Sequence, residues 1–325
     1  MPNVLLTSAG RRVALLRAFR AALASVGGGR VFAADAGGTA AAIHEADEGF
    51  VVPRCDSPDY VPALLALCRR ENVALVVPTI DPELPVLGRA RDLFAREGVL
   101  LAASGPATND IAFDKANTAT FFDREGIPAP RQIDLVGALA GRNGFVFPVA
   151  LKPRFGSGSV GVHIVRDLEE LRFYARRVPE PLLQEYVEGS EFTLDVLVAP
   201  DGSVACVVPR RRLETRAGEI SKGYTVRDPE IEAWGRRVCD RLPDAAGPIT
   251  LQCFRRHDGE LAFIEINPRF GGGFPLALHA GADYPRWLLE WALGLPSTAS
   301  PDAWGADVAM LRYDDAIFVS REALA

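Results

Sequence analysis

Short apolar segments alternate with longer amphipathic ones over the first hundred residues of the chain. The apolar segments have the length of buried strands, and they lie at 4–7, 31–34, 49–52, 74–78 and 99–102. Between them, apolar residues recur at helical spacing at about 11–25, 60–71 and 83–97. Because strands and helices alternate, we predict a doubly wound parallel sheet for this part of the chain.

Several polar residues directly follow the predicted strands of this sheet. Ligands of parallel α/β sheets bind outside the carboxyl ends of the strands, so Ser8, Asp81 and Glu83 are candidate substrate-binding residues. A carboxylate of Asp81 or Glu83 could hold the ammonium group of an amino-acid-like substrate. Capping of the helix that begins near Glu83 explains Asp81 equally well.

The pattern changes after the Ser-Gly-Pro sequence at 104–106, which marks a domain boundary. A helix is predicted at about 110–125, and hairpins with intervening helices follow it. The predicted strands lie at 149–153, 162–165, 182–187, 193–199, 204–210, 247–255 and 261–266, with one strand or two at 306–319. The predicted helices lie at 167–177, 229–242 and 284–293. We therefore expect an α+β fold with antiparallel sheets in this region.

The composition excludes several classes of protein. The chain has 325 residues, a net charge of −6 and no apolar run of the roughly 18–20 residues that a membrane helix needs. It lacks the basic excess that a general nucleic-acid binder shows. The five cysteines form no CxxC pair, which indicates free thiols in a reducing compartment. With no secretory signal visible, we expect a cytoplasmic protein that binds neither nucleic acid nor a membrane.

Lysine is rare in this chain. Of the 36 basic residues, only Lys115, Lys152 and Lys222 are lysines. A lysine ammonium meets a phosphate as a compact point charge, whereas the arginine guanidinium is a planar fork. The three lysines are therefore candidates for positions where arginine does not fit, although chance retention explains any one of them equally well.

Lys152 ends a predicted strand and is followed by a loop with glycine at positions 156, 158 and 161. Glycine lets the backbone approach a phosphate closely, and the lysine adds a positive charge. The loop is neither a Walker A motif nor a Rossmann fingerprint, because it joins two strands. Taken alone, a flexible hairpin explains it as well.

The segment from Gln184 to Thr193 ends a predicted strand and turns at Gly189. Its extended backbone could present a carbonyl and an amide to the edge of an adenine, and Glu191 could accept hydrogen bonds from ribose hydroxyls. Acidic turns are common, so this segment is weak evidence by itself.

Oxygen ligands gather on the last predicted hairpin. Glu265 and Asn267 face the same side of one strand, and Gln252 lies across the hairpin. Three such oxygens suit Mg²⁺, and Arg269 could stabilise a transferring phosphoryl group. A polar outer face is the alternative, but a carboxylate in the apolar run 261–266 is costly unless it is paired or bound to a metal.

In their order and spacing, the Lys–Gly/Ser loop, the Q-E-Y-V-E-G-x-E segment and the E-I-N-P-R signature resemble those of the ATP-grasp ligases, and within them one half of the carbamoyl phosphate synthase large subunit. The resemblance covers the chain from residue 1 to about 295. It implies a Rossmann-like preATP-grasp domain at 1–105, followed by the two subdomains of an ATP-grasp fold, at 106–188 and 189–325.

The resemblance also implies roles for the motif residues. It places ATP against Lys115, Lys152, Gly156, Ser157, Gly158, Gly161, Glu185, Tyr186, Val187 and Glu191. It implies one or two Mg²⁺ ions, with Mn²⁺ as a substitute, on Gln252, Glu265 and Asn267.

The same resemblance implies that Arg269 stabilises phosphoryl transfer and that Lys222 contacts the γ-phosphate or the acyl phosphate. A solvated loop lysine is the alternative for Lys222. Arg210 and Arg212 are candidates for binding the substrate carboxylate, because an arginine fork binds a carboxylate through two hydrogen bonds. A surface position explains these two arginines nearly as well.

The implied reaction is the ATP-dependent ligation of a small-molecule carboxylate to an amine through an acyl phosphate, with release of ADP and phosphate. The sequence shows one ATP-grasp unit rather than two, so carbamoyl phosphate synthesis is not expected. The alternatives are an enzyme that forms carboxyphosphate or carbamoyl phosphate, and a nucleotide-binding module without ligase activity. A homodimer is expected by family analogy.

Overall fold

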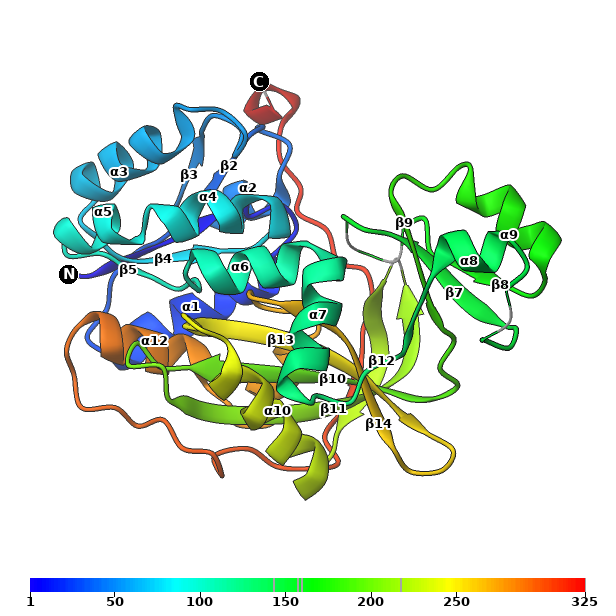
Figure 1. The fold of residues 1–325 in the computed structure, drawn as a ribbon. Coiled ribbons are helices and arrows are strands. Elements are labelled where there is room, and N and C mark those ends of the chain that lie inside the picture. Colours follow the sequence, from blue (N-terminus) through cyan, green and yellow to red (C-terminus); the bar gives the residue numbers. More distant parts are fainter. Residues whose placement is uncertain (143, 157, 159, 217, 325) are drawn as a thin grey trace.

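The computed structural model describes the whole chain except residues 143, 157, 159, 217 and 325, and the described part contains three β-sheets (Figure 1). The first sheet has five parallel strands in the order β3-β2-β1-β4-β5. Its strands are β1 (Asn3–Thr7), β2 (Val31–Asp35), β3 (Glu48–Val51), β4 (Val73–Pro78) and β5 (Leu100–Leu101). The prediction of a doubly wound parallel sheet is confirmed.

Helices cover both faces of the parallel sheet. They are α1 (Val13–Ser25) and α2 (Ala41–Glu45) on one face, and α3 (Tyr60–Arg70), α4 (Leu84–Arg89) and α5 (Arg91–Arg96) on the other. Along β1, Val4 and Leu6 belong to the core under α1, whereas Leu5 belongs to the core under α3. Because both faces are buried, the strand is a continuous apolar run.

The single helix predicted at 83–97 is wrong. The chain there forms a 3₁₀ turn, η1 (Asp81–Glu83), and then the separate helices α4 and α5. The break falls at Ala90, whose φ of −94° and ψ of 1° leave the helical region. Alanine is the strongest helix former, so nothing at this position signals the break.

The second sheet is antiparallel, with four strands in the order β6-β9-β7-β8. The strands are β6 (Gln132–Ile133), β7 (Val149–Pro153), β8 (His163–Val165) and β9 (Pro181–Glu185). Helices α8 (Leu135–Leu139) and α9 (Leu168–Ala175) pack with it around a small apolar core of their own. Figure 1 shows this unit standing to one side of the rest of the molecule.

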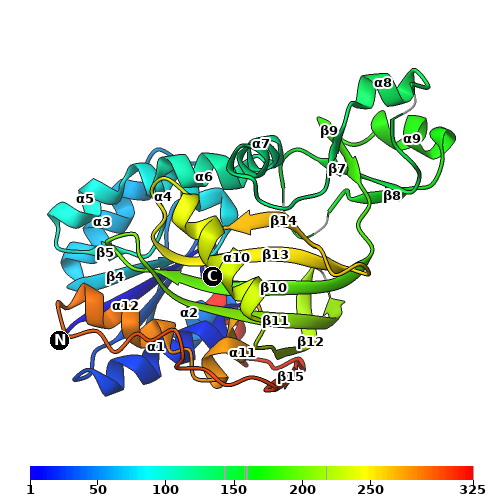
Figure 2. The same ribbon diagram turned by 60° about the horizontal axis from the view of Figure 1, so that its bottom comes forward.

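The third sheet is a large antiparallel one, with six strands in the order β14-β13-β10-β11-β12-β15. The strands are β10 (Gly189–Val198), β11 (Val204–Arg216), β12 (Glu219–Thr225), β13 (Gly247–Arg256), β14 (Leu261–Asn267) and β15 (Ala309–Leu311). One face packs under α10 (Pro229–Arg241), and the other packs with α1, α11 (Phe274–His279) and α12 (Tyr284–Ala292) (Figure 2). The third sheet therefore joins the parallel sheet through one continuous core.

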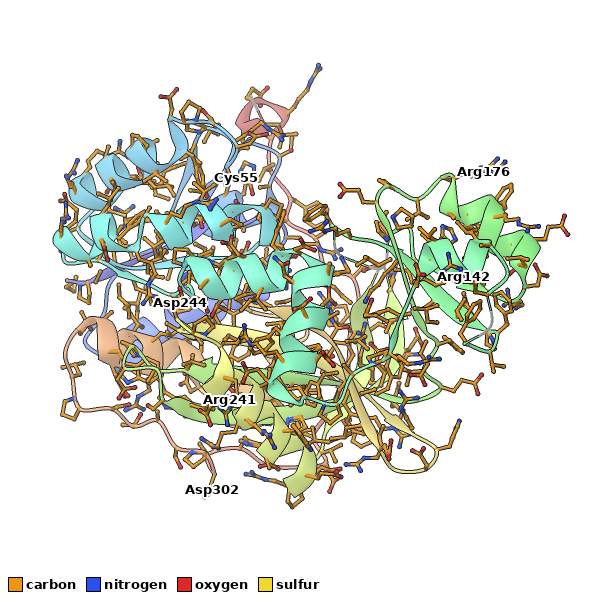
Figure 3. The ribbon with its side chains drawn as sticks, in the orientation of Figure 1. Cys55, Arg142, Arg176, Arg241, Asp244 and Asp302 are labelled. Atoms are coloured by element: carbon orange, nitrogen blue, oxygen red, sulfur yellow. The ribbon has the colours of Figure 1, made fainter. Side chains whose placement is uncertain are left out.

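Two helices, α6 (Pro106–Phe113) and α7 (Lys115–Glu125), replace the single helix predicted at 110–125. The break falls at Asp114, which caps α7 by accepting a hydrogen bond from the Ala116 amide. Asp244, labelled in Figure 3, accepts hydrogen bonds from the amides of Ala107 and Thr108 at the start of α6. Apolar residues of both helices belong to the same core as the six-stranded sheet. The domain limits expected at 105/106 and 188/189 stay a prediction.

Strand β12 is absent from the sequence-based prediction, which also ends β11 early, at residue 210. The two strands form a long hairpin that runs to Arg216 and returns from Glu219. Only Ala309–Leu311 is a strand within the predicted 306–319 segment. Among the described residues, no helix is long and apolar enough to cross a membrane.

Candidate active site

A cavity of about 250 Å³ lies between the four-stranded and six-stranded sheets, and we call it the nucleotide cavity. Its apolar walls come from both sheets and are formed by Ala150, Val162, Ile164, Phe254 and Ile264. The segment 184–187, which leads from one sheet to the other, also lines it. An apolar slot with a few polar groups at its edge is typical of a small-molecule site.

Two of the three lysines meet in this cavity. Lys152 ends β7 and is buried, and Lys115 is the first residue of α7. Burial, together with the charge of Lys115, lowers the pKa of Lys152 to about 8, although Glu265 opposes the shift. Burial also lowers the pKa of Lys115. Two cations held close together in a partly dry site are suited to a polyanion such as a triphosphate.

The glycine loop joins β7 to β8 over this cavity. Gly156, Gly158 and Gly161 have φ angles of 101°, 67° and 75°, which side-chain-bearing residues rarely adopt. Ser157, predicted as a nucleotide contact, lies outside the described residues. The Lys115 ammonium donates to the Gly156 carbonyl at 2.5 Å, so the loop and the lysine are already in contact.

An ion pair anchors the base of this loop. The Arg154 guanidinium donates to both carboxylate oxygens of Asp114, at 2.6–2.9 Å. The hydrogen bond from Arg154 lowers the pKa of Asp114, and burial opposes this shift. Since Asp114 also caps α7, one carboxylate ties the helix that presents Lys115 to the loop that follows Lys152.

The segment predicted to hold the adenine is fixed from outside the cavity. The Glu185 carboxylate accepts from Arg256 at 2.6 Å and from the Arg131 amide at 3.2 Å, and the pair with Arg256 lowers its pKa. The Glu185 amide donates to the Arg131 carbonyl, and the Glu185 carbonyl and the Val187 amide stay the predicted nucleobase contacts. Tyr186 lines the same edge.

Glu191, the predicted ribose ligand, also lines the cavity, and Arg212 donates to it at 2.5 Å. Burial raises the pKa of Glu191 although the arginine opposes the shift.

The three predicted metal ligands do lie side by side. Gln252 pairs with Glu265 across β13 and β14, and Asn267 is two residues further along β14. Arg212 donates to the Gln252 side-chain oxygen, and Arg269 to that of Asn267, both at 3.3 Å. These long contacts are weak, so a cation could replace them.

The donor set fits Mg²⁺ rather than a transition metal. One carboxylate and two amide oxygens beside a phosphate site match the oxygen ligands of Mg²⁺. Among the residues with described placement, no group of three His, Cys, Asp or Glu side chains could hold a metal ion.

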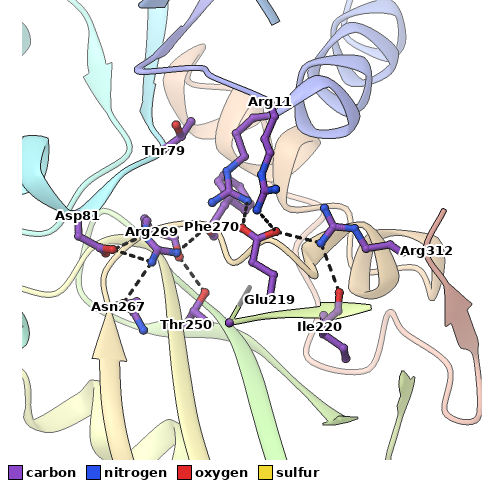
Figure 4. A network of polar contacts seen from close by, with 12 residues as sticks. Arg11, Thr79, Asp81, Glu219, Ile220, Thr250, Asn267, Arg269, Phe270 and Arg312 are labelled. Atoms are coloured by element: carbon purple, nitrogen blue, oxygen red, sulfur yellow. Dashed lines mark hydrogen bonds and ion pairs between the residues drawn. The ribbon is translucent and has the colours of Figure 1, made fainter. Parts of the chain in front are cut away.

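A second cavity, of about 380 Å³, meets the first at Gln252 and Glu265, and we call it the arginine cavity. Four arginines line it: Arg12, Arg210, Arg212 and Arg269. Arg269 donates through Nε and Nη2 to the two carboxylate oxygens of Asp81, at 2.7 and 2.8 Å (Figure 4). The loop after β4 thereby holds the arginine that follows β14.

Arg210 is fully buried and donates to Asp195 at 2.5 and 3.0 Å. Its third nitrogen, Nη1, has no hydrogen-bond partner among the described residues, and neither has Arg212 Nε. Both side chains line the arginine cavity. These two atoms are themselves shielded from the cavity, and a buried donor without a partner is costly.

Two family models match the chain. One, described as "PylC-like, N-terminal domain", matches residues 4–102, and the other, described as "ATP-grasp in the biosynthetic pathway with Ter operon", matches residues 177–314. The second of these models thus covers the C-terminal part of the chain with an ATP-grasp family. The resemblance inferred from the sequence is confirmed.

Curated relatives agree with this resemblance. It is 28% identical to a carbamoyl-phosphate synthase of Methanobrevibacter smithii over 46% of this chain and 41% of the relative. It is also 28% identical to a D-alanine–D-alanine ligase of Corynebacterium aurimucosum, over 46% of this chain and 44% of the relative. The chain thus spans less than half the length of these two relatives.

Solved structures share the fold at low identity. The biotin carboxylase domain of a Hydrogenobacter thermophilus 2-oxoglutarate carboxylase superimposes with a TM-score of 0.74 at 20% identity, over 94% of this chain and 73% of that one. The N5-carboxyaminoimidazole ribonucleotide synthetase of Thermotoga maritima gives a TM-score of 0.66 at 19% identity, over 92% and 78%. At this identity, the likeness is evidence of the ATP-grasp fold alone.

Three residues predicted as site residues lie apart from the two cavities or are engaged elsewhere. Lys222 is half exposed on β12 and donates to Glu214 at 2.6 Å. Glu83 is fully buried, and it accepts from Tyr60 at 2.5 Å and from Ser8 at 3.0 Å. The structure therefore gives Glu83 and Ser8 a local structural role.

Sequence analysis missed Arg12, Glu219 and the three glycines 271–273, which all line the arginine cavity. A Cβ at Gly273 would overlap the Arg210 guanidinium, and one at Gly272 would overlap the Glu219 carboxylate. The Gly-Gly-Gly sequence soon after Arg269 is a signal that could have been used. Arg12 and Glu219 carry no comparable signal.

Proposed function

We propose that this ATP-grasp protein is an ATP-dependent ligase that joins a small-molecule carboxylate to an amine. One observation supports this most directly: the nucleotide cavity with its two lysines opens at Gln252 and Glu265 into a cavity lined by four arginines. A phosphate donor and an anionic acceptor would meet at that junction. The names of relatives include D-alanine–D-alanine ligase, and a solved neighbour with ADP is an N5-carboxyaminoimidazole ribonucleotide synthetase.

The proposed reaction has two steps. A carboxylate oxygen attacks the γ-phosphorus of ATP, the bond from that phosphorus to the β–γ bridging oxygen breaks, and ADP leaves. An amine nitrogen then attacks the acyl carbon, phosphate leaves with the carbon–oxygen bond electrons, and the nitrogen loses a proton. Such chemistry depends on positioning and charge neutralisation more than on covalent catalysis.

In this proposal the nucleotide cavity binds the phosphates and the arginine cavity binds the substrate carboxylate. Lys115 and Lys152 hold the phosphates, while the guanidinium groups of Arg210 and Arg212 line the arginine cavity and would face the carboxylate. Gln252, Glu265 and Asn267 would hold Mg²⁺, which neutralises phosphate charge when bound. Arg269 lines the arginine cavity and stabilises charge on the transferring group. Apolar walls exclude water, which would hydrolyse an acyl phosphate.

Release of ADP tests this proposal. We expect ADP and phosphate to form from Mg-ATP only with particular pairs from a panel of amino acids and small carboxylates, with bicarbonate included as a donor. Release with bicarbonate alone would favour the carboxyphosphate alternative. Nucleotide binding without turnover of any pair would favour a binding module.

The metal assignment is tested by Glu265→Gln. We expect ADP release to fall by about 100-fold or more, because Glu265 is the charged member of the three proposed metal ligands. Glu260→Gln, at the exposed turn of the same hairpin, is the matched control and should retain full turnover. Full turnover in Glu265→Gln would contradict the assignment.

Finer points of the proposal concern metal and assembly. One or two Mg²⁺ ions, Mn²⁺ substitution and a homodimer remain predictions. Metal titration of ADP release tests the first two, and light scattering tests the third.

A further inference from the structure

A third cavity, of about 560 Å³, lies beneath the C-terminal segment, and we call it the tail cavity. Residues 310–317 form one side, and the start of α1 together with the start of α11 forms the other. Figure 1 shows this terminal segment running along the parallel-sheet domain. A volume of this size is within the range of small-molecule sites.

The tail cavity adjoins the arginine cavity. Both are lined by Arg12, Glu219, Ile220, Gly271 and Gly272. A Cβ at Gly272 would overlap the Glu219 carboxylate, so the absence of a side chain there lets this carboxylate pack directly against the backbone. The two cavities therefore share a boundary formed by Glu219 and the backbone of 271–272.

Positive charge exceeds negative charge at this boundary. Glu219 pairs with Arg11 at 3.2 Å, with Arg12 at 3.1 Å and with Arg312 at 3.0 Å (Figure 4). Burial would raise the pKa of Glu219, but Arg12 and then Arg312 and Arg11 lower it overall. Three guanidinium groups thus face one carboxylate that stays ionised.

These arginines keep hydrogen-bond capacity for a second anion. Among the described residues, the hydrogen bonds from the side chains of Arg12 and Arg312 come from Nη1 alone. A guanidinium has five N–H donors in a fork that matches a carboxylate. The arrangement can therefore accept a carboxylate beside Glu219.

The rest of the tail cavity combines apolar side chains with three charged ones, Arg216, Asp314 and Asp315, of which Arg216 and Asp314 pair at 2.8 Å. Its apolar side chains come from α1, α11 and the terminal segment, and they are Val13, Leu15, Phe274, Pro275, Met310, Leu311 and Ile317. The cavity thus combines an anion-binding end at the arginines with a surface for an aliphatic or aromatic group.

We propose that the tail cavity binds the amine substrate and that this substrate is an amino acid with an apolar side chain. Its carboxylate would lie on Arg12 and Arg312, its side chain on the apolar wall, and its nitrogen toward Gly271 and Gly272. From there the nitrogen attacks the acyl carbon, the amide bond forms, phosphate leaves and the nitrogen loses a proton. This inference rests on the proposed ligase function and names the class of its second substrate.

Calorimetry with three probes tests the ligand class without any mutation. L-Leucine and L-phenylalanine are titrated into the full chain with and without Mg-ADP, and L-leucinamide serves as the probe that lacks a carboxylate. We expect at least one of the two amino acids to bind, and leucinamide to bind about 10-fold more weakly or worse than leucine. Binding of neither amino acid, or equal binding of leucinamide, would overturn the proposal.

A matched pair of variants tests the site. Arg312→Gln should weaken amino-acid binding by about 10-fold or more, because it removes a charge-assisted bond to the carboxylate. Arg69→Gln is the control: Arg69 lies on α3 and, like Arg312, is partly exposed and paired with one glutamate, Glu97. Unchanged affinity in Arg312→Gln would place the amino acid elsewhere.

Titration of Mg-ADP into the same proteins separates the two proposals. If the wild-type protein does not bind Mg-ADP, the proposed ligase function is contradicted. If it binds Mg-ADP but no amino acid, only the proposal for the tail cavity is contradicted.

Discussion

Lys152 illustrates how one residue combines structural and functional constraints. It is buried at the end of a strand, next to a second lysine, and its pKa is lowered to about 8. Such a cation is unfavourable in the free protein and becomes favourable when an anion binds beside it. The neighbouring residues with unpaired donors, Arg210 and Arg212, follow the same logic on the carboxylate side of the site.

Nucleotide binding should therefore depend on pH near 8. Only the charged form of Lys152 attracts phosphate, so affinity for ADP should be highest below pH 8 and should fall as the pH rises above it. Binding at about pH 8 should also take up protons, which calorimetry in buffers of different ionisation enthalpy measures. Lys152→Met should abolish most of this uptake, and uptake that persists unchanged would contradict the assignment.

The buried pair of Arg210 and Asp195 should dominate local stability. Asp195→Ala leaves a buried guanidinium without its partner, and we expect a loss of about 3–5 kcal/mol in the free energy of unfolding. Glu97→Ala removes an exposed pair with Arg69 and should cost less than about 1 kcal/mol. Urea denaturation of both variants measures the difference. Similar decreases in the free energy of unfolding would contradict the prediction that the Asp195–Arg210 pair stabilises the fold more than the exposed pair does.

At the scale of elements, the candidate site is formed where several helices and strands begin or end close to one another. Helix α7 begins at Lys115, the glycine loop begins after β7, and the Asp114–Arg154 pair connects the two. Strands β13 and β14 place the oxygen ligands because their register aligns Gln252 with Glu265. Secondary structure thus sets the spacing of the phosphate and metal groups.

The connection at Asp114 should matter for nucleotide affinity. Asp114→Ala removes the cap of α7 and frees Arg154, so we expect the KM for ATP to rise about 3- to 10-fold with a smaller change in kcat. Asp134→Ala is the matched control, since Asp134 caps α8 by accepting from the Val136 amide. Equal rises of KM in both variants would mean that only general stability is affected.

At the scale of the whole molecule, the arginine cavity lies where the parallel sheet meets the six-stranded sheet. Asp81 comes from the loop after β4, and Arg269 comes from the segment after β14, 188 positions later. Arg12 and Glu219 make a second bridge across the same boundary. The packing of the two sheets therefore decides which arginines face the site.

Disrupting the first bridge should affect chemistry more than nucleotide binding. In Asp81→Asn the aspartate charge that holds Arg269 is lost, and we expect kcat to fall about 10- to 100-fold while the KM for ATP changes little. Asp81→Glu keeps the charge and should recover part of kcat. A rise in KM alone, or no recovery with glutamate, would contradict this positioning role.

Much of the fold and part of the site follow from local sequence. Buried strands such as β1 and β7 are visible as apolar runs, and the hairpin of β13 and β14 places Gln252, Glu265 and Asn267 together through its two-residue period. Breaks at Ala90 and Asp114 were not predicted, because tertiary contacts and caps override helix propensity there.

The sequence by itself determined the parallel and antiparallel parts of the fold and the row of oxygen side chains on β13 and β14, because each depends on residues close together along the chain. Only the tertiary structure decided that Arg210 is buried while Lys222 is half exposed, that Asp81 holds Arg269, and that Glu219 gathers three arginines above the tail cavity. The burial and pairing of these side chains depend on contacts between segments far apart in sequence. No local period or motif encodes which face of one sheet will meet another.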